Sequence, residues 1–131
     1  MTYNELSETI IGVAIDIHRK LGPGLLESVY QHILVYELRK RGLSVRTEEP
    51  VPLIWDKIQF VMAFRADLIV EEMILVEIKS LEELASVHKR QLLTYLRVMD
   101  RRLGLLVNFG DEVLKDGIRR VINGTLPDDN A

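Results

Sequence analysis

The chain has 131 residues, 47% of them hydrophobic and 28% charged, with a formal charge of −3. This size and composition predict one globular domain with a substantial core and give no indication of disorder. The apolar runs are shorter than the ~18 residues of a membrane span, and the polar, acidic start argues against an export signal. The absence of cysteine excludes disulfides and thiolate metal sites. We therefore expect a cytoplasmic protein without membrane contact.

The acidic balance argues weakly against a dedicated high-affinity nucleic-acid binder, because phosphate contacts require a concentrated positive field. Basic clusters nevertheless occur at 39–41, 88–90, 101–102 and 119–120. Each cluster taken singly is explained as a solvated helix end. Several of them could also combine into one positive patch.

Two helices are predicted before any strand. Apolar residues recur at helical spacing from Leu6 to Leu21, where Gly22-Pro23-Gly24 ends the helix. A second helical pattern runs from Leu26 to Leu38 and ends in a basic turn and a glycine. The apolar face of the first helix could pack on its own sheet or on a second subunit, so a homodimer is one interpretation.

The middle of the chain changes to strand patterns. Short strands are predicted at 44–48, 51–55 and 59–64, with prolines and Asp56-Lys57 as edge or turn markers. Two further strands, 67–70 and 74–79, are joined by a hairpin at Glu71-Glu72. Together these segments predict an antiparallel meander.

The last third of the chain predicts a crossover helix and a buried strand. Helical spacing covers 82–99, and the near-continuous apolar run 103–109 is typical of a strand covered on both faces and parallel to a neighbour. Residues 113–122 are compatible with a strand or a short helix. We expect one domain over 1–125, a polar tail over 126–131, and an α/β fold with a mixed sheet flanked by helices.

Three charged residues lie within the apolar strand segments. Period-two alternation places Glu77 and Lys79 on one face about 7 Å apart, and Asp67 lies on the adjoining strand. Carboxylates can hold a hard cation such as Mg²⁺, and a nearby ammonium can position water or stabilise phosphate charge. The alternative is that all three face solvent on a half-exposed sheet.

Polar residues on the predicted helices could extend such a site. Glu27 and Tyr30 share a face at the start of the second helix, where an acid also simply complements the helix dipole. His88, Gln91 and Tyr95 form a stripe on the crossover helix. That stripe indicates either a cleft or partial exposure beside the core.

Taken in chain order, these residues form the pattern Gly24-x-x-Glu27-x-x-Tyr30, Arg65-x-Asp67, Glu77-Ile78-Lys79-Ser80 and Gln91-x-x-x-Tyr95. From about Leu6 to Ile122 the chain resembles the GxxExxY family of small bacterial and archaeal proteins, assigned to the PD-(D/E)XK nuclease superfamily. The resemblance implies a restriction-endonuclease-like αβββαβ core. One departure is Ala66, which stands where the superfamily name has proline.

The resemblance also implies roles for the residues of the site. Asp67, Glu77, the Ile78 carbonyl and Glu27 would hold Mg²⁺ or Mn²⁺. Asp67, Glu77 and Lys79 would be the catalytic residues.

Four further residues would bind substrate or orient the site, namely Tyr30, Arg65, Gln91 and Tyr95. The last two resemble the Gln-x-x-x-Tyr motif of the RecB-like branch. The expected function is a metal-dependent nuclease, with DNA favoured over RNA. The alternatives are a nuclease-fold module that binds nucleic acid or regulates a partner with little or no turnover, and a purely structural protein.

Overall fold

The computed structural model describes residues 1–127. Its elements follow in the order α1 (Tyr3–Leu21), α2 (Glu27–Lys40), β1 (Val45–Trp55), β2 (Ile58–Val70), β3 (Ile74–Lys79), α3 (Ser86–Met99), β4 (Leu103–Asn108), the 3₁₀ turn η1 (Leu114–Gly117) and β5 (Ile118–Ile122).

The five strands form one mixed sheet in the order β1-β2-β3-β4-β5. Strands β1, β2 and β3 are antiparallel neighbours, β3 and β4 are parallel, and β5 returns antiparallel to β4. A parallel pair requires a crossover connection, which α3 supplies. The predicted meander, crossover helix and parallel buried strand are therefore confirmed.

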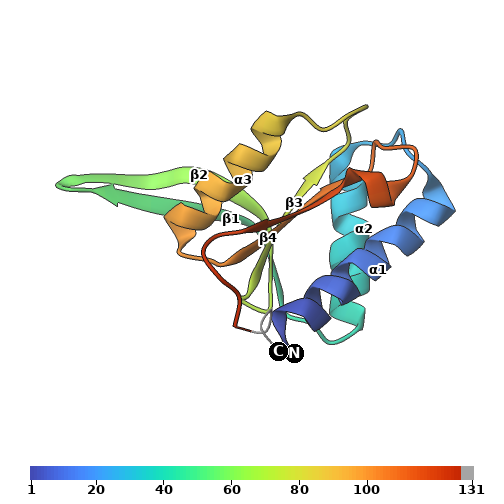
Figure 1. The fold of residues 1–131 in the computed structure, drawn as a ribbon, viewed down its shortest axis with the longest axis horizontal. Helices are drawn as coiled ribbons and strands as arrows, with labels where there is room; N and C mark the ends of the chain where they lie inside the picture. Colours follow the sequence, from blue (N-terminus) through green and yellow to red (C-terminus); the bar gives the residue numbers. More distant parts are fainter. Residues whose placement is uncertain (128–131) are drawn as a thin grey trace.

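Helices cover both faces of the sheet. Figure 1 shows α1 and α2 on one face and α3 on the other. The larger core cluster joins α1 and α2 to the sheet, and a second cluster joins α3 to the opposite face. The expected α/β architecture, with a restriction-endonuclease-like sheet flanked by helices, is confirmed.

Helix α1 begins at a capping box. The Thr2 hydroxyl accepts the Glu5 amide, and the Glu5 carboxylate accepts the Thr2 amide, so two otherwise unpaired backbone donors are satisfied. Its apolar residues, Leu6, Ile10 and Val13 among them, are buried in the larger cluster. The apolar face of α1 therefore packs on its own sheet and is not available to a second subunit.

Strands β1 and β2 are longer than the sequence pattern predicts. Segments 44–48 and 51–55 join into one strand through Pro50, and 59–64 joins 67–70 without a break. Proline lacks an amide donor, but β1 is an edge strand and half of its amides need no partner. The prediction of separate short strands is therefore wrong, whereas the predicted turns at Asp56-Lys57 and Glu71-Glu72 are confirmed.

Near Asp67, the side chains of β2 switch from one face of the sheet to the other. Leu68 packs in the α1–α2 cluster, but Ala66 packs in the α3 cluster, although residues two apart in a regular strand share a face. Opposite this point, between the pairs Thr47↔Leu68 and Glu49↔Ala66, Glu48 has φ of +50°. A glutamate with a left-handed backbone conformation is uncommon. Here it marks the irregularity that places Asp67 between the α1–α2 cluster and the α3 cluster.

Helix α3 begins at Ser86 and not at Glu82, so that predicted boundary is wrong. The Ala85 amide donates to His88 Nδ1, which caps the helix there. Residues 113–122 contain both predicted alternatives, a 3₁₀ turn followed by a strand.

Near the C-terminus, Leu126 is buried in the larger cluster although we expected it to begin the polar tail. The tail residues 128–131 lie outside the described residues. None of the helices within 1–127 has the length and apolar character needed to cross a membrane.

Candidate active site

Asp67 and Glu77 form a reciprocal pair, called the carboxylate pair below. The regular β2–β3 ladder ends at Leu68↔Val76. Beyond it, the Asp67 amide donates to Glu77 Oε2 and the Ile78 amide donates to Asp67 Oδ2, both at 2.8 Å. Each side chain therefore takes the place of a backbone carbonyl, and the two carboxylates converge where the strands separate.

Burial makes ionisation of the carboxylate pair unfavourable. Burial, helped by the charges of Glu27 and Glu48, raises the pKa of Asp67 to about 6, although the hydrogen bond from the Ile78 amide and the charge of Lys79 act in the opposite direction. Burial and, second, the charge of Asp67 raise the pKa of Glu77 to about 8. The hydrogen bond from the Asp67 amide and the charge of Lys79 act in the opposite direction. A half-buried Asp67 beside a buried Glu77, both with raised pKa values, is typical of sites that bind a cation or move protons.

The end of β3 supplies two more polar groups. The Lys79 carbonyl accepts the Phe109 amide, so it faces β4, and alternation along a strand then turns the polar edge of Ile78 towards β2. The bond from the Ile78 amide to Asp67 agrees with this orientation. The Ile78 carbonyl therefore faces the carboxylate pair, and the charge of Lys79 favours the ionised form of both acids.

Helix α2 contributes from the other side through residues that the sequence did not single out. The Gln31 amide nitrogen donates to Glu48 Oε1 at 2.6 Å and, more weakly, to the Asp67 carbonyl at 3.4 Å. Gln31 is buried, and Glu27, one turn earlier, is exposed. In the sequence, only the position of Gln31 one helical turn after Glu27 could have indicated its role. Nothing in the sequence predicted the left-handed backbone conformation of Glu48.

Tyr95 brings α3 to the carboxylate pair, while its predicted companions stay exposed. Its ring stacks on Phe64 with centroids 3.8 Å apart, and burial followed by the charges of Glu77 and Asp67 raises the pKa of its phenol. Gln91 is exposed on α3, and Arg65 is exposed on β2 opposite Pro50. The structure thus brings Tyr95 close and leaves the other two at the rim.

Tyr30 is fully buried, so its effect on the site is to orient it. Its hydroxyl donates to the Gly22 carbonyl and accepts the Leu25 amide, and its ring stacks on Phe109. Ser80 donates to the carbonyl of the same Leu25. The loop that leads into Glu27 is therefore fastened both to the core and to the residue that follows Lys79.

Asn108 fixes the chain just after Lys79, a role that the sequence did not reveal. Its side-chain oxygen accepts the Leu81 amide, and its side-chain nitrogen donates to the Leu81 carbonyl and to Asp111. A Cβ at Gly110 would lie 1.9 Å from the Leu81 carbonyl oxygen, so the two loops touch backbone to backbone. This clamp sets the direction in which β3 ends.

A family model described as the PD-(D/E)XK nuclease superfamily matches residues 4–121. The chain belongs to the PD-(D/E)XK nuclease superfamily. No curated protein and no solved structure matches it significantly. The match covers every element from α1 to β5, and it supports a nuclease-type function acting on nucleic acid.

PD-(D/E)XK nucleases generally use divalent metal ions, and the donor chemistry of this chain fits such an ion in part. Each carboxylate has one oxygen held by an amide and a second oxygen not used in those bonds, and the Ile78 carbonyl faces the same point. Hard cations prefer such oxygen donors. Within residues 1–127, however, no three His, Cys, Asp or Glu side chains are arranged as a ready metal centre. Glu27 acts on the pair through its charge and does not complete a cluster.

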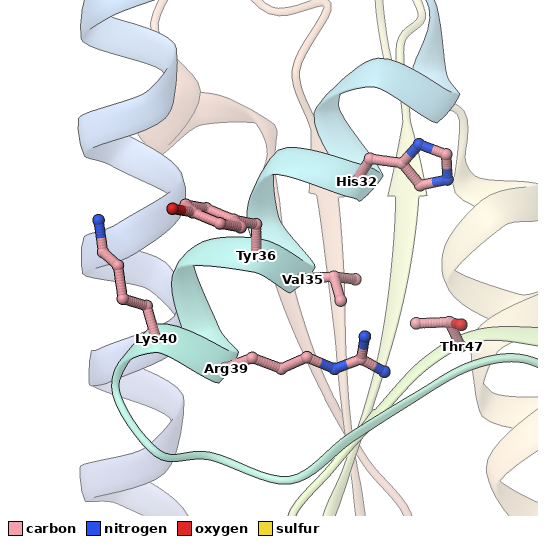
Figure 2. Close-up of a pocket in the computed structure, with 6 residues that line it drawn as sticks. All are labelled: His32, Val35, Tyr36, Arg39, Lys40 and Thr47. Atoms are coloured by element: carbon pink, nitrogen blue, oxygen red, sulfur yellow. The ribbon is translucent and has the colours of Figure 1, made fainter.

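A groove lies beside α2. It encloses about 600 Å³ and is lined by His32, Val35, Tyr36, Arg39, Lys40 and Thr47, the set called the α2 groove below. In Figure 2, His32 and Arg39 extend towards Thr47, while Tyr36 and Lys40 lie on the other flank of the helix. Two lining residues are sequence neighbours of the Gln31–Glu48 contact, since His32 follows Gln31 and Thr47 precedes Glu48.

Proposed function

We propose that this protein is a metal-dependent nuclease that hydrolyses phosphodiester bonds, with DNA favoured over RNA. The observation that carries the proposal is the carboxylate pair, two converging acids with raised pKa values beside Lys79 in a PD-(D/E)XK fold. The order of its motifs further supports membership of the GxxExxY family and a relation to the RecB-like branch.

In this proposal Asp67, Glu77 and the Ile78 carbonyl hold Mg²⁺ or Mn²⁺, and Glu27 joins them when substrate and ion are present. The ion would supply Lewis acidity and a lowered pKa for an attacking water. A positive ion between the two acids would offset the burial and the nearby negative charges that raise their pKa values, so both would be ionised ligands at neutral pH.

Lys79 has the role of stabilising the negative charge that develops on the phosphate during in-line attack. Its ammonium lies at the end of β3, on the strand that carries Glu77, and it already acts electrostatically on both acids. A preorganised positive charge of this kind needs no reorganisation at the moment of reaction. The same ammonium can orient the attacking water.

The substrate path in this proposal runs over Tyr95 and along the α2 groove. Tyr95, with Gln91 and Arg65 at the rim, contacts the nucleotides next to the scissile bond. Arg39 and His32 contact phosphates further along the strand. The Lys40 ammonium is already paired with Glu37 at 3.3 Å, whereas Arg39 makes one bond to the Val45 carbonyl and retains its charge and further donors, so Arg39 is the principal phosphate contact in the groove.

The test is cleavage of a panel of single- and double-stranded DNA and RNA with Mg²⁺ or Mn²⁺. We expect Glu77→Ala and Lys79→Ala to lower the rate by about 100-fold or more, while Glu83→Ala and Lys20→Ala, exposed residues away from the site, keep it. Equal rates for wild type and both site variants, or inertness of all proteins on every substrate, would refute the nuclease proposal.

A second candidate function is a nucleic-acid-binding or regulatory module with little turnover. The absence of a ready three-residue metal cluster within 1–127 favours this alternative. Calorimetry separates the two functions. Mn²⁺ binding that Asp67→Asn abolishes supports a live metal site, whereas tight retention of nucleic acid with no Mn²⁺ binding supports the module.

A further inference from the structure

The distal part of the β1–β2 hairpin, residues 52–63, is called the arm here. Helix α3 covers these strands as far as Val51 and Phe64, which are buried in the second cluster. The register shifts between Val51 and Leu53, directly after this covered part. Figure 1 shows the arm extending well beyond α3 as a two-stranded ribbon. A two-stranded ribbon without further packing is marginally stable in water.

The arm exposes large apolar side chains along its length. Trp55 is 70% exposed, Ile58 56% and Phe60 48%. The ladder places Trp55 opposite Ile58 and the half-buried Leu53 opposite Phe60. Because residues two apart in a strand share a face, these four side chains form one continuous apolar face. Contiguous exposed apolar surface of this kind marks an interaction site.

We propose that the apolar face of the arm binds the same face of a second copy of this chain, so that the protein forms a two-fold symmetric dimer. The arm carries only two charged residues, Asp56 and Lys57, which have opposite sign. Two arms therefore meet without net repulsion. A nucleic-acid strand would instead require concentrated positive charge, which the arm lacks.

Two prolines favour packing face to face over pairing along the β1 edge. Pro50 and Pro52 lie in β1, the edge strand of the sheet. Because proline has no amide donor, these residues weaken any strand added along that edge. The apolar face has no such obstacle, and a two-fold axis through it repeats the same contact on both copies.

The exposed area is consistent with a reversible dimer. Aromatic side chains bury roughly 150–250 Å² each, so the half-exposed residues of this face offer about 400 Å² per copy. Stable interfaces bury about 800 Å² per partner. The arm thus supplies about half of a standard interface, and we expect dissociation in the micromolar range or weaker.

The experiment uses Trp55, the single tryptophan of the chain. Its emission is measured from about 1 μM to 1 mM together with sedimentation equilibrium. We expect a concentration-dependent shift to shorter wavelength that follows the rise in mass. Phe60→Lys and Ile58→Lys should both remain monomeric, with at least a tenfold weaker association. Val113→Lys, which replaces a residue 55% exposed outside the arm, should associate like wild type.

The outcomes that overturn the proposal are equally defined. A wild type that stays monomeric at 1 mM, or a dimer that both lysine variants retain, would exclude the arm as a self-association surface. A blue shift that appears only with lipid vesicles, or quenching only with nucleic acid, would assign the surface to that other partner. Because the replaced side chains are exposed in the monomer, the variants should fold normally, and circular dichroism checks this. The proposal is independent of the nuclease activity.

Discussion

Glu77→Gln tests the electrostatics of the carboxylate pair directly. Burial and Asp67 raise the pKa of Glu77 from 4.5 to about 8, so the folded chain keeps a proton that the unfolded chain has released. Below pH 4.5 Glu77 is protonated in both the folded and the unfolded chain, so it does not affect the free energy of unfolding. Between pH 4.5 and about 8 Glu77 lowers the free energy of unfolding progressively, and above about pH 8 this destabilisation, the penalty below, is fully present.

The size of the penalty follows from the same values. At about 1.4 kcal/mol per pKa unit, a rise from 4.5 to about 8 destabilises the ion-free folded chain by about 3 kcal/mol at pH 7 and by about 5 kcal/mol at pH 9. Glutamine has a similar shape, keeps an oxygen that can accept the Asp67 amide, and carries no charge. We therefore expect Glu77→Gln to be more stable than wild type by these amounts.

Urea unfolding followed by circular dichroism measures the difference at pH 4.5, 7 and 9 in the presence of a chelator. Glu83→Gln, an exposed glutamate outside the site, controls for the change of charge alone. Added Mg²⁺ or Mn²⁺ should reverse the order, because only wild type retains both carboxylate ligands.

Equal free energies of unfolding for wild type and Glu77→Gln at all three pH values would contradict this prediction. A wild type that gains stability relative to the variant as the pH rises without ion would also contradict it, because the sign of the linkage would then be opposite. Equal stabilisation of both proteins by Mn²⁺ would place the ion elsewhere.

Three further predictions concern the frame around the site. Gly110→Ala should cost more than about 3 kcal/mol or prevent folding, because its Cβ would meet the backbone of the facing loop, whereas Gly12→Ala has open space and should gain up to about 1 kcal/mol, both measured by urea unfolding. Tyr30→Phe removes two buried hydrogen bonds and should cost about 1–3 kcal/mol; an unchanged melting temperature would contradict it. Arg39→Ala should weaken nucleic-acid binding and lower its salt dependence by about one unit, an effect that Arg41→Ala, at the same helix end, should not reproduce if the α2 groove is the path.

The sequence predicted the sheet because each strand has a local signature. The apolar run 103–109 indicated a strand covered on both faces, and the structure confirms it beside β3. The approach of Asp67 to Glu77 also followed from the hairpin. Period two and a short turn are local properties, so they can be read without tertiary information.

The errors come from tertiary context. Pro50 suggested a strand break because its edge position was not visible from the sequence. The face change at Glu48 depends on which helix covers each half of the hairpin, and Gln31 matters only because α2 meets that point. Asn108 was read as part of an apolar strand, although it clamps the chain after Lys79. Such contacts join residues distant in sequence, so no local pattern announces them.

Because of the reciprocal hydrogen bonds of the carboxylate pair, two backbone amides can report on the ionisation of the acids that they contact. The Ile78 amide senses Asp67, whose pKa is about 6, and the Asp67 amide senses Glu77, whose pKa is about 8. In an NMR spectrum of nitrogen-15-enriched protein, these two resonances should move at different pH values, one for each acid. Titration with Mg²⁺ at constant pH should shift both amide resonances together, and so measure occupancy of the site by the ion without any substrate.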